Sequence, residues 1–311
     1  MKENQQSIPV LAVSDLSVKF RMYTGRTAQH DLEVISNLSI CVHTGEVLAV
    51  VGSSGSGKSL LAHAILGILP RNAIVSGDMQ YSGLPLTPDL QEKLRGREMA
   101  LVPQSVSFLD PLMRVETQVI GLTGTKEKQR RLFQRYRLEE EVGRLYPHQL
   151  SGGMARRILV TTAVIENAKL IVADEPTPGL SPELAKETLQ NFRELADQGA
   201  AVILITHDID LALAIADRIA VFYAGTTVEV APVSDFQGQG ESLRHPYSKA
   251  FLVALPQNSF CAIPGFQPYA GDLPPGCLFG PRCQSCTQEC LAGTPPMRTI
   301  RGGEVRCIHA T

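Results

Sequence analysis

Strand-like and helix-like patterns of apolar residues alternate in the first part of the chain. Residues 11–20 and 33–42 alternate apolar with polar positions, which predicts strands of a mostly antiparallel sheet. The apolar run at 46–51 predicts a buried strand. A glycine-rich loop separates it from residues 58–69, where apolar positions recur at helical spacing until Pro70. This part of the chain is therefore expected to form strand, loop and helix in that order.

Two more strand and helix pairs follow. Buried strands are predicted at 170–174 and 201–206, and each precedes a helix, over 182–198 and 210–216 respectively. Repeated units of this kind indicate an α/β fold, in which helices cover the faces of a parallel sheet. At about 105–165 the pattern is helical and rich in charge, which predicts a helical insertion.

The character of the chain changes near residue 240. Proline and glycine become frequent beyond this point, and we expect neither helices nor strands there. The sequence thus predicts a domain of residues 1–240, with a helical subdomain at about 105–165. A small extension rich in proline and cysteine is expected over residues 241–311.

Composition narrows the classes of protein that fit this pattern. Of the 311 residues, 44% are hydrophobic, which is enough for a sizeable core, and the formal net charge is -2. Without a basic surface, no nucleic-acid partner is expected. No run approaches the roughly 18 apolar residues of a membrane helix, and residues 1–10 lack the order of a signal peptide. We therefore expect a cytoplasmic protein that reaches a membrane only through partners.

The loop after the strand at 46–51 matches the phosphate-binding pattern G-x-x-x-x-G-K-[ST] at every fixed position. Its backbone N–H groups can surround phosphates at the start of a helix. Lys58 can neutralise the β- and γ-phosphate oxygens, and the Ser59 hydroxyl can bind Mg²⁺. The predicted nucleotide-binding residues are Gly52, Ser53, Ser54, Gly55, Ser56, Gly57, Lys58 and Ser59.

Polar residues follow three other predicted strands. Asp174 closes one strand and Glu175 comes next, while His207 and Gln104 each follow a strand of their own. Because the carboxyl ends of parallel strands meet at one edge of a sheet, these side chains are expected beside the phosphate loop. Asp174 suits a Mg²⁺ site and Glu175 a general base that activates water. His207 is expected to face the γ-phosphate, and Gln104 to reach Mg²⁺ and the attacking water.

The sequence LSGGM at Leu150–Met154 identifies a family. Together with the phosphate loop, Gln104, the carboxylate pair and His207, it resembles the ATP-binding-cassette (ABC) ATPases over residues 11–235. The resemblance implies a P-loop NTPase with a RecA-like core, an antiparallel β subdomain and a helical subdomain. It also implies that the chain binds ATP and Mg²⁺ and hydrolyses ATP.

The same resemblance implies a head-to-tail dimer. In it, Ser151, Gly152 and Gly153 close over the ATP held by the partner's phosphate loop, and Phe20 falls where an aromatic ring stacks on adenine. The arrangement is physically reasonable, because a Ser-Gly-Gly turn that opens a helix offers N–H groups and the positive end of a dipole to a phosphate.

Longer stretches resemble the peptide and nickel import branch of the family. These are SFLDPLMRV after Gln104, YPHQLSGGM before the signature helix, HPYSKAFLVALP at 245–256 and GCLFGPRC in the tail. The resemblance implies a motor subunit paired with a second ABC ATPase, as a homodimer or a heterodimer. It further implies two integral membrane permease subunits, an external substrate-binding protein, and a place on the cytoplasmic face of the inner membrane. Residues 104–112 would receive a coupling helix of a permease.

Three features depart from the family pattern, one of which is Pro178-Gly179 in place of smaller, less constrained residues. Ser181 stands in the loop EPTPGLS where the family has Asp, and a hydroxyl cannot accept a charge-assisted hydrogen bond as a carboxylate does. Ala155 replaces a basic residue after Met154. The resemblance implies that the loop with Ser181 crosses to the opposite ATP site of the dimer, so the change at Ser181 bears on the strength of communication between the two sites. Peptide and nickel, free or chelated, both stay open as cargo, and the alternative function is a soluble or regulatory ABC ATPase that is not coupled to transport.

Cysteines crowd the end of the chain. Cys277, Cys283, Cys290 and Cys307 match the tail of the import branch, which implies a [4Fe-4S] cluster, while Cys286 is extra to that pattern. From the residues alone, a proline-rich segment without a core needs a staple, which a metal can supply. Zinc suits the same thiolates, so an iron–sulfur cluster, zinc and reduced structural thiols all stay open.

Overall fold

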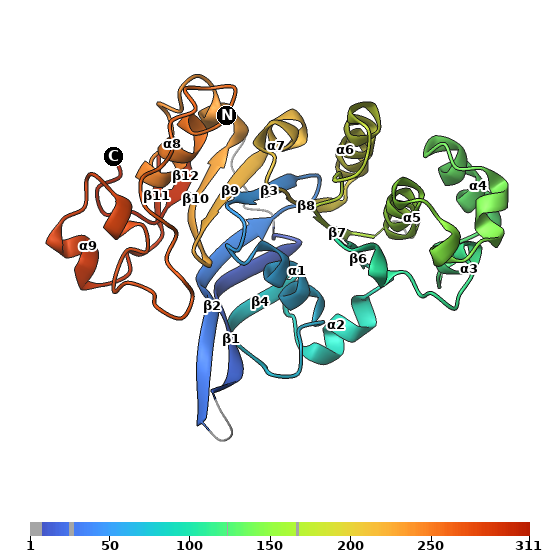
Figure 1. The fold of residues 1–311 in the computed structure, drawn as a ribbon, viewed down its shortest axis with the longest axis horizontal. Helices are drawn as coiled ribbons and strands as arrows, with labels where there is room; N and C mark the ends of the chain where they lie inside the picture. Colours follow the sequence, from blue (N-terminus) through green and yellow to red (C-terminus); the bar gives the residue numbers. More distant parts are fainter. Residues whose placement is uncertain (1–7, 25–27, 123, 166–167) are drawn as a thin grey trace.

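Two β-sheets with helices on their faces make up the fold, which a computed structural model describes for residues 8–24, 28–122, 124–165 and 168–311 (Figure 1). The smaller sheet is antiparallel, with the strand order β2-β1-β4-β5. Its strands are β1 (Leu11–Thr24), β2 (Ala28–Val42), β4 (Ala73–Tyr81) and β5 (Leu84–Pro85). The first two confirm the strands expected at 11–20 and 33–42, and they lengthen into a ribbon that projects from the molecule in Figure 1.

The larger sheet has the strand order β11-β12-β10-β9-β3-β8-β7-β6, and its strands from β9 to β6 are parallel. β3, β7 and β8 confirm the three buried strands that the apolar runs predict. The strands are β3 (Val47–Gly52), β6 (Met99–Val102), β7 (Leu170–Asp174), β8 (Ala201–Ile205), β9 (Arg218–Tyr223), β10 (Thr226–Pro232), β11 (Arg298–Ile300) and β12 (Gly303–Val305).

Helices connect the parallel strands and also form a group beyond β6, on the right in Figure 1. That group consists of α3, α4 and α5, which lie in the stretch expected to be helical. The helices are α1 (Lys58–Leu66), α2 (Pro88–Leu94), α3 (Val115–Ile120), α4 (Lys126–Arg135), α5 (Gly152–Val164), α6 (Pro182–Asp197), α7 (Ile209–Ile215), α8 (Pro246–Val253) and α9 (Gln288–Ala292). Within the described part of the chain, none of them is long and apolar enough to cross a membrane.

The region after residue 240 is more regular than the sequence analysis expects. It contains α8, α9, β11 and β12, and β12 pairs with β10, so that this region extends the larger sheet. Elements this short carry too few residues to show a periodicity, which explains why the apolar pattern misses them. The domain boundary near residue 240 stays a prediction. Of the opening stretch, residues 1–7 lie outside the described residues.

The apolar run of β3 is continuous because both faces of this strand are covered. Val47, Ala49 and Val51 belong to one buried cluster, whereas Leu48 and Val50 belong to the other. Alternate side chains of a strand point to opposite faces, so a strand buried on both sides needs an apolar residue at every position. The phosphate loop therefore follows a strand that is fixed from both faces.

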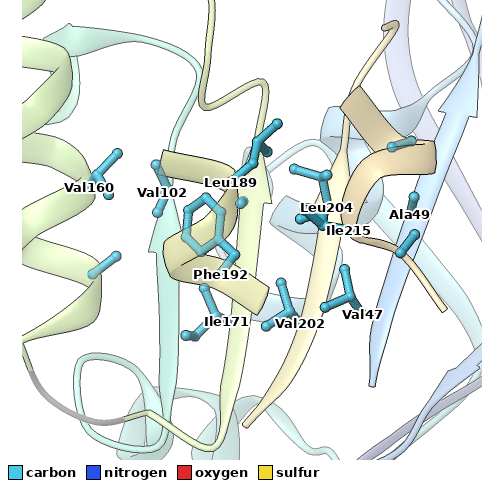
Figure 2. Packing of buried hydrophobic residues seen from close by; sticks show 14 of the residues in the cluster. Val47, Ala49, Val102, Val160, Ile171, Leu189, Phe192, Val202, Leu204 and Ile215 are labelled. Carbon is cyan, nitrogen blue, oxygen red and sulfur yellow. The ribbon is translucent and has the colours of Figure 1, made fainter. Parts of the chain in front are cut away.

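Phe192 of α6 packs onto the strands of the larger sheet, next to Leu189 and Ile171 (Figure 2). Its side chain is fully buried. We expect Phe192→Ala to lower the free energy of unfolding by about 3–5 kcal/mol, because it removes buried apolar surface and leaves a cavity. Urea denaturation measures the change. Phe266→Ala is the matched control, since Phe266 is 94% exposed, and a loss as large there would contradict the burial argument.

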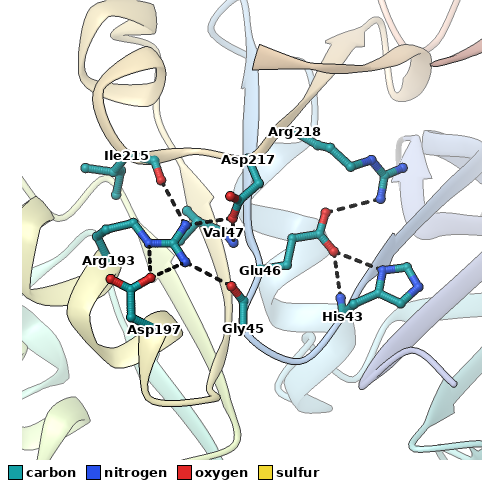
Figure 3. Close-up of polar contacts among 9 residues, drawn as sticks. All are labelled: His43, Gly45, Glu46, Val47, Arg193, Asp197, Ile215, Asp217 and Arg218. Atoms are coloured by element: carbon teal, nitrogen blue, oxygen red, sulfur yellow. Dashed lines mark hydrogen bonds and ion pairs between the residues drawn. The ribbon is translucent and has the colours of Figure 1, made fainter. Parts of the chain in front are cut away.

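A polar network fixes the beginning of β3, at the end of the strand opposite the phosphate loop (Figure 3). The Arg193 guanidinium of α6 donates to the Gly45 carbonyl at 2.9 Å and pairs with Asp217 at 2.7 Å. Asp217 in turn accepts from the backbone N–H of Val47 at 2.8 Å. The network joins α6 to the starts of β3 and β9, which sets the register of the sheet that carries the site.

Candidate functional site

The phosphate loop, residues 52–59, joins β3 to α1. The backbone of the loop requires glycine at two positions, one for a close approach and one for a left-handed conformation. A Cβ on Gly52 would lie 2.4 Å from the Phe222 carbonyl oxygen, and Gly57 caps α1 with φ +91. An L side chain at either position would force the loop away from β9 or into strain. The sequence motif is thus explained by how closely the loop approaches its neighbours.

Lys58 is the first residue of α1, and its amino group folds back over the loop. Nζ donates to the carbonyls of Gly52 and Ser53, each at 2.9 Å. Burial lowers the pKa of Lys58, and the nearby carboxylates of Glu175 and Asp174 oppose that shift. The lysine therefore places a cation among the loop carbonyls, within electrostatic reach of the two acids.

Asp174 ends β7 beneath the phosphate loop. Burial raises the pKa of this carboxyl, while a hydrogen bond from the Ser59 side chain opposes the rise. Asp174 Oδ1 and Ser56 Oγ are buried without a hydrogen-bond partner among the described residues. A hard cation prefers oxygen ligands such as these. The donor set around Ser59 and Asp174 therefore fits Mg²⁺.

Glu175 follows in a left-handed backbone conformation, with φ 48. Its Oε1 lies 2.8 Å from Nδ1 of His207, which follows β8, and its Oε2 is buried without a partner in the described structure. A non-glycine residue at positive φ is uncommon, and such conformations cluster at functional sites. The parallel ends of β7 and β8 bring this acid and this histidine together, as the sequence predicts.

A cavity of about 630 Å³ lies over the phosphate loop and has a volume suited to a nucleotide. It brings Gln104, Glu175 and His207 to the same space as the loop. The lining residues are Val34, Ser54, Gly55, Ser56, Gly57, Lys58, Ser59, Leu60, Gln104, Glu175 and His207. These groups supply a cation, backbone donors and a carboxylate around one substrate-sized volume, which is the chemistry that phosphoryl transfer to water needs.

Phe20 does not line this cavity. It lies on β1 opposite Leu32 of β2, and it packs against the core beneath the smaller sheet. The structure thus does not bring Phe20 to the phosphate loop, and its predicted stacking on adenine stays a prediction. An aromatic residue on a strand is more often a core residue, which is the environment found here.

The signature turn lies outside the cavity. Ser151 caps α5, since its hydroxyl accepts from the N–H of Met154 at 3.3 Å, and Ser151 and Gly152 are exposed. A Cβ on Gly153 would lie 3.9 Å from the Gly179 carbonyl, so this turn adjoins the loop that departs from the family. In that loop Ser181 caps α6 through the N–H of Leu184. The turn is open on its outer side, and its predicted role toward a partner's ATP stays a prediction.

Two contributors to the site escape the sequence analysis. Arg156 of α5 donates to the carbonyls of Pro103 and Gln104, at 3.1 and 2.5 Å, and so holds the strand end that carries Gln104. Val34 lines the cavity from the irregular stretch of β2. No local sequence pattern predicts that Val34 lines the cavity, because its position there depends on a register shift between β1 and β2. An arginine close behind the signature turn is the sequence signal that could have drawn attention to Arg156.

The structure gives no support for the metal site expected in the cysteine tail. Among the described residues there is no group of three or more His, Cys, Asp or Glu side chains that could hold a metal ion, and all the cysteines are free. The [4Fe-4S] cluster expected on Cys277, Cys283, Cys290 and Cys307 is therefore unsupported, as is zinc. Burial raises the pKa of Cys277 and of Cys283, which favours neutral thiols. Both pack against the main core as small apolar groups.

Comparison with protein families gives two matches. Residues 35–178 match the ABC transporter family, and residues 228–290 match the family described as "Oligopeptide/dipeptide transporter, C-terminal region". The oligopeptide transport ATP-binding protein OppD of Escherichia coli is 32% identical over 97% of this chain and 93% of its own length. OppD of Haemophilus influenzae is 31% identical over 96% of each chain.

Solved structures share the fold. An ATP-binding subunit of an ABC transporter superposes with a TM-score of 0.61 at 26% identity, covering 73% of this chain and 92% of that one. A dimeric ATP-binding cassette in a post-hydrolysis state, bound to ADP and phosphate, gives the same TM-score of 0.61 at 22% identity, over 72% of this chain and 98% of that one. The expected cassette fold is thereby confirmed.

Proposed function

This chain belongs to the ABC transporter family of ATP-hydrolysing subunits, and from that membership we propose that it drives the import of oligopeptides. Support comes from relatives named for oligopeptide transport that match nearly the whole chain, and from the match of residues 228–290 to an oligopeptide and dipeptide transporter region. The part of the proposal that concerns ATP hydrolysis rests above all on one observation. Lys58, Gln104, Glu175 and His207 line a single cavity at the ends of parallel strands.

In the proposed hydrolysis, Glu175 accepts a proton from the water that attacks the γ-phosphate. His207 lies 2.8 Å from one carboxylate oxygen and orients it, which leaves the other oxygen free to act as base. Lys58 moves from the loop carbonyls to the phosphate oxygens and stabilises the charge that develops on them. Ser59, Asp174 and Gln104 would hold Mg²⁺, which neutralises charge on the β- and γ-phosphates.

We propose that the signature turn, Ser151–Gly153, contacts a second ATPase subunit. Ser151 and Gly152 are exposed at the start of α5, a helix of 13 residues whose first N–H groups point along its axis. Such a turn can bind the γ-phosphate of a nucleotide held by another subunit. ATP binding then closes two subunits on each other, and hydrolysis releases them.

The face beyond β6 is the proposed contact with the membrane permeases. Val106, Phe108, Leu112 and Met113 expose apolar side chains there, and Phe108 also lines a cavity of about 400 Å³ beside α1 and α5. A groove of this kind suits the apolar side of a short coupling helix. Arg156 joins this face to the site, because it holds the carbonyl of Gln104, and so permease movement can reach the cavity.

Uptake in cells tests the cargo. In a strain that lacks this chain, we expect the wild-type protein to restore uptake of labelled dipeptides and longer oligopeptides and Lys58→Ala to fail, because Lys58→Ala cannot hold the phosphates. Nickel uptake, measured in the same cells, is the internal control and should not change. Loss of nickel uptake alone would assign the metal cargo. No loss of either would favour the soluble or regulatory alternative.

A further inference from the structure

The C-terminal region touches the phosphate loop directly. The Ser53 hydroxyl, in the second position of the loop, donates to Oε1 of Gln267, which lies in the proline-rich segment after α8. Gln267 is half-buried. The contact is unexpected, because a loop that binds phosphate through its backbone has no need of a distant glutamine.

A second residue of the same region reaches the same serine. Tyr247 of α8 is 2% exposed. Burial raises the pKa of its hydroxyl, and the neighbouring Ser53 opposes that rise, so the hydroxyl lies beside the serine. The start of α8 is fixed by His245, whose Nδ1 accepts from the N–H of Tyr247 at 3.0 Å. Complete burial lowers the pKa of His245 to about 3, so this acceptor stays neutral and available.

Both contacts are supported by packing. The Tyr247 ring lies 4.5 Å from the Tyr223 ring and 5.3 Å from the Phe279 ring, centroid to centroid, which fixes its direction. Arg282 donates to the carbonyls of Ile263 and Pro264, at 2.9 and 2.7 Å, just before Gln267 in the chain. Ring packing therefore fixes the Tyr247 side chain, and the hydrogen bonds of Arg282 fix the segment that precedes Gln267.

Ser53 is linked to the catalytic lysine. Its carbonyl accepts a hydrogen bond from Lys58 Nζ at 2.9 Å, so the position of Ser53 helps to set that of the amino group. Two contacts hold this one residue, Lys58 at its carbonyl and Gln267 at its hydroxyl, and the Tyr247 hydroxyl lies beside it. A loop fixed before the nucleotide arrives loses less conformational freedom on binding.

We propose that Gln267 and Tyr247 are positioning residues for the phosphate loop, which makes the C-terminal region a functional part of the nucleotide site. The inference rests on the proposed role of residues 52–59 in binding phosphate. Neither side chain lines the cavity, so both act through Ser53 and not on the nucleotide itself.

The test measures affinity for ATP and turnover separately. We expect Gln267→Ala and Tyr247→Phe each to raise the Kd for a fluorescent ATP analogue, and the KM for ATP in the assembled transporter, by about three- to ten-fold. Gln267→Ala removes a hydrogen bond from the loop, and Tyr247→Phe removes the hydroxyl that lies beside Ser53. The kcat should change by less than about twofold, since neither residue touches the reacting atoms. Tyr247→Phe keeps the aromatic packing and so isolates the hydroxyl. Gln257→Ala is the matched control, because Gln257 bonds to Asp210 and not to the loop.

A double-mutant cycle separates positioning from general destabilisation. If Gln267 acts through Ser53, then Ser53→Ala should raise Kd as Gln267→Ala does, and the double variant should be no weaker than either single one. Additive effects, or an unchanged Kd in Gln267→Ala, would overturn the inference. Lys58→Ala, measured in parallel, distinguishes failure of the positioning inference from failure of the proposed phosphate site. If Lys58→Ala also leaves Kd unchanged, the proposed phosphate site itself is wrong.

Discussion

Glu175→Gln is expected to lower kcat for ATP hydrolysis by about 100- to 10,000-fold, the range that a positioned general base contributes. The amide has nearly the same shape as the carboxylate and keeps an oxygen for His207, but it cannot accept a proton from water. Affinity for ATP should therefore stay within about twofold of the wild-type value. The assay is phosphate release by the assembled transporter, with nucleotide binding measured on the same preparation.

The surroundings of Glu175 explain why Glu175→Gln should have the largest effect on kcat. Glu175 is 7% exposed and pairs with His207 at 2.8 Å, while its second oxygen has no protein partner in the described structure. A carboxylate left with a free oxygen in a cavity is arranged for proton transfer and not for stability. Glu194→Gln is the control, because Glu194 is an exposed partner of Arg135 and should leave kcat within about twofold. Turnover close to wild type in Glu175→Gln would remove this residue as the base.

The centre of the site could be predicted from the sequence because its residues follow strand ends. Val47–Gly52, Leu170–Asp174 and Ala201–Ile205 are fully apolar up to their last positions, and the chemistry begins immediately afterwards. Parallel strands end at one edge of a sheet, so finding the strands also locates Lys58 and Glu175. Local sequence patterns are enough to predict these site residues, because the ends of parallel strands always meet at one edge of the sheet.

Other parts of the site depend on contacts that no local pattern carries. Ser53 and Gln267 are 214 positions apart. Their hydrogen bond depends on tertiary contacts such as that of Arg282, which donates to the Pro264 carbonyl and to the Tyr223 hydroxyl of β9. Phe20 shows why the family pattern alone does not settle the environment of a residue. Its position matches an adenine-stacking residue in the family pattern, yet its neighbours on the folded ribbon place it against a core. Spacing in a sequence does not reveal which face of a strand is covered.

The cysteine tail shows a third limit. Cysteine spacing restricts which thiols can meet, but a metal site also needs the side chains to point at one centre. In the described structure the backbone N–H of Cys277 donates to the carbonyl of Cys290 at 2.7 Å, so the two chain segments do come together. Among the described residues, however, no group of three or more side chains is placed to hold a metal, so the predicted cluster stays unsupported. Packing holds the tail, as do arginine side chains such as that of Arg298, which donates to the Cys307 carbonyl.

Lys58→Ala is expected to weaken ATP binding by about 100-fold. Hydrogen bonds to charged groups contribute about 1.5–3 kcal/mol each, and a loss near 2.8 kcal/mol corresponds to that factor in Kd. Lys58 is 8% exposed, and the described structure pairs its amino group with two backbone carbonyls. Carbonyls are weaker partners for a cation than phosphate oxygens, so the amino group is free to change partners when a nucleotide arrives.

Titration with a fluorescent ATP analogue measures the change, and Lys169→Ala is the control. Lys169 is a surface lysine whose ion pair with Glu98 spans 3.0 Å, so its removal should leave Kd unchanged. An equal loss in both variants would indicate a general effect of charge, and an unchanged Kd in Lys58→Ala would contradict the phosphate site. Compared with Glu175→Gln, this variant should fail at an earlier step. Lys58→Ala loses the nucleotide, whereas Glu175→Gln holds it without turnover, and that difference assigns one residue to binding and the other to chemistry.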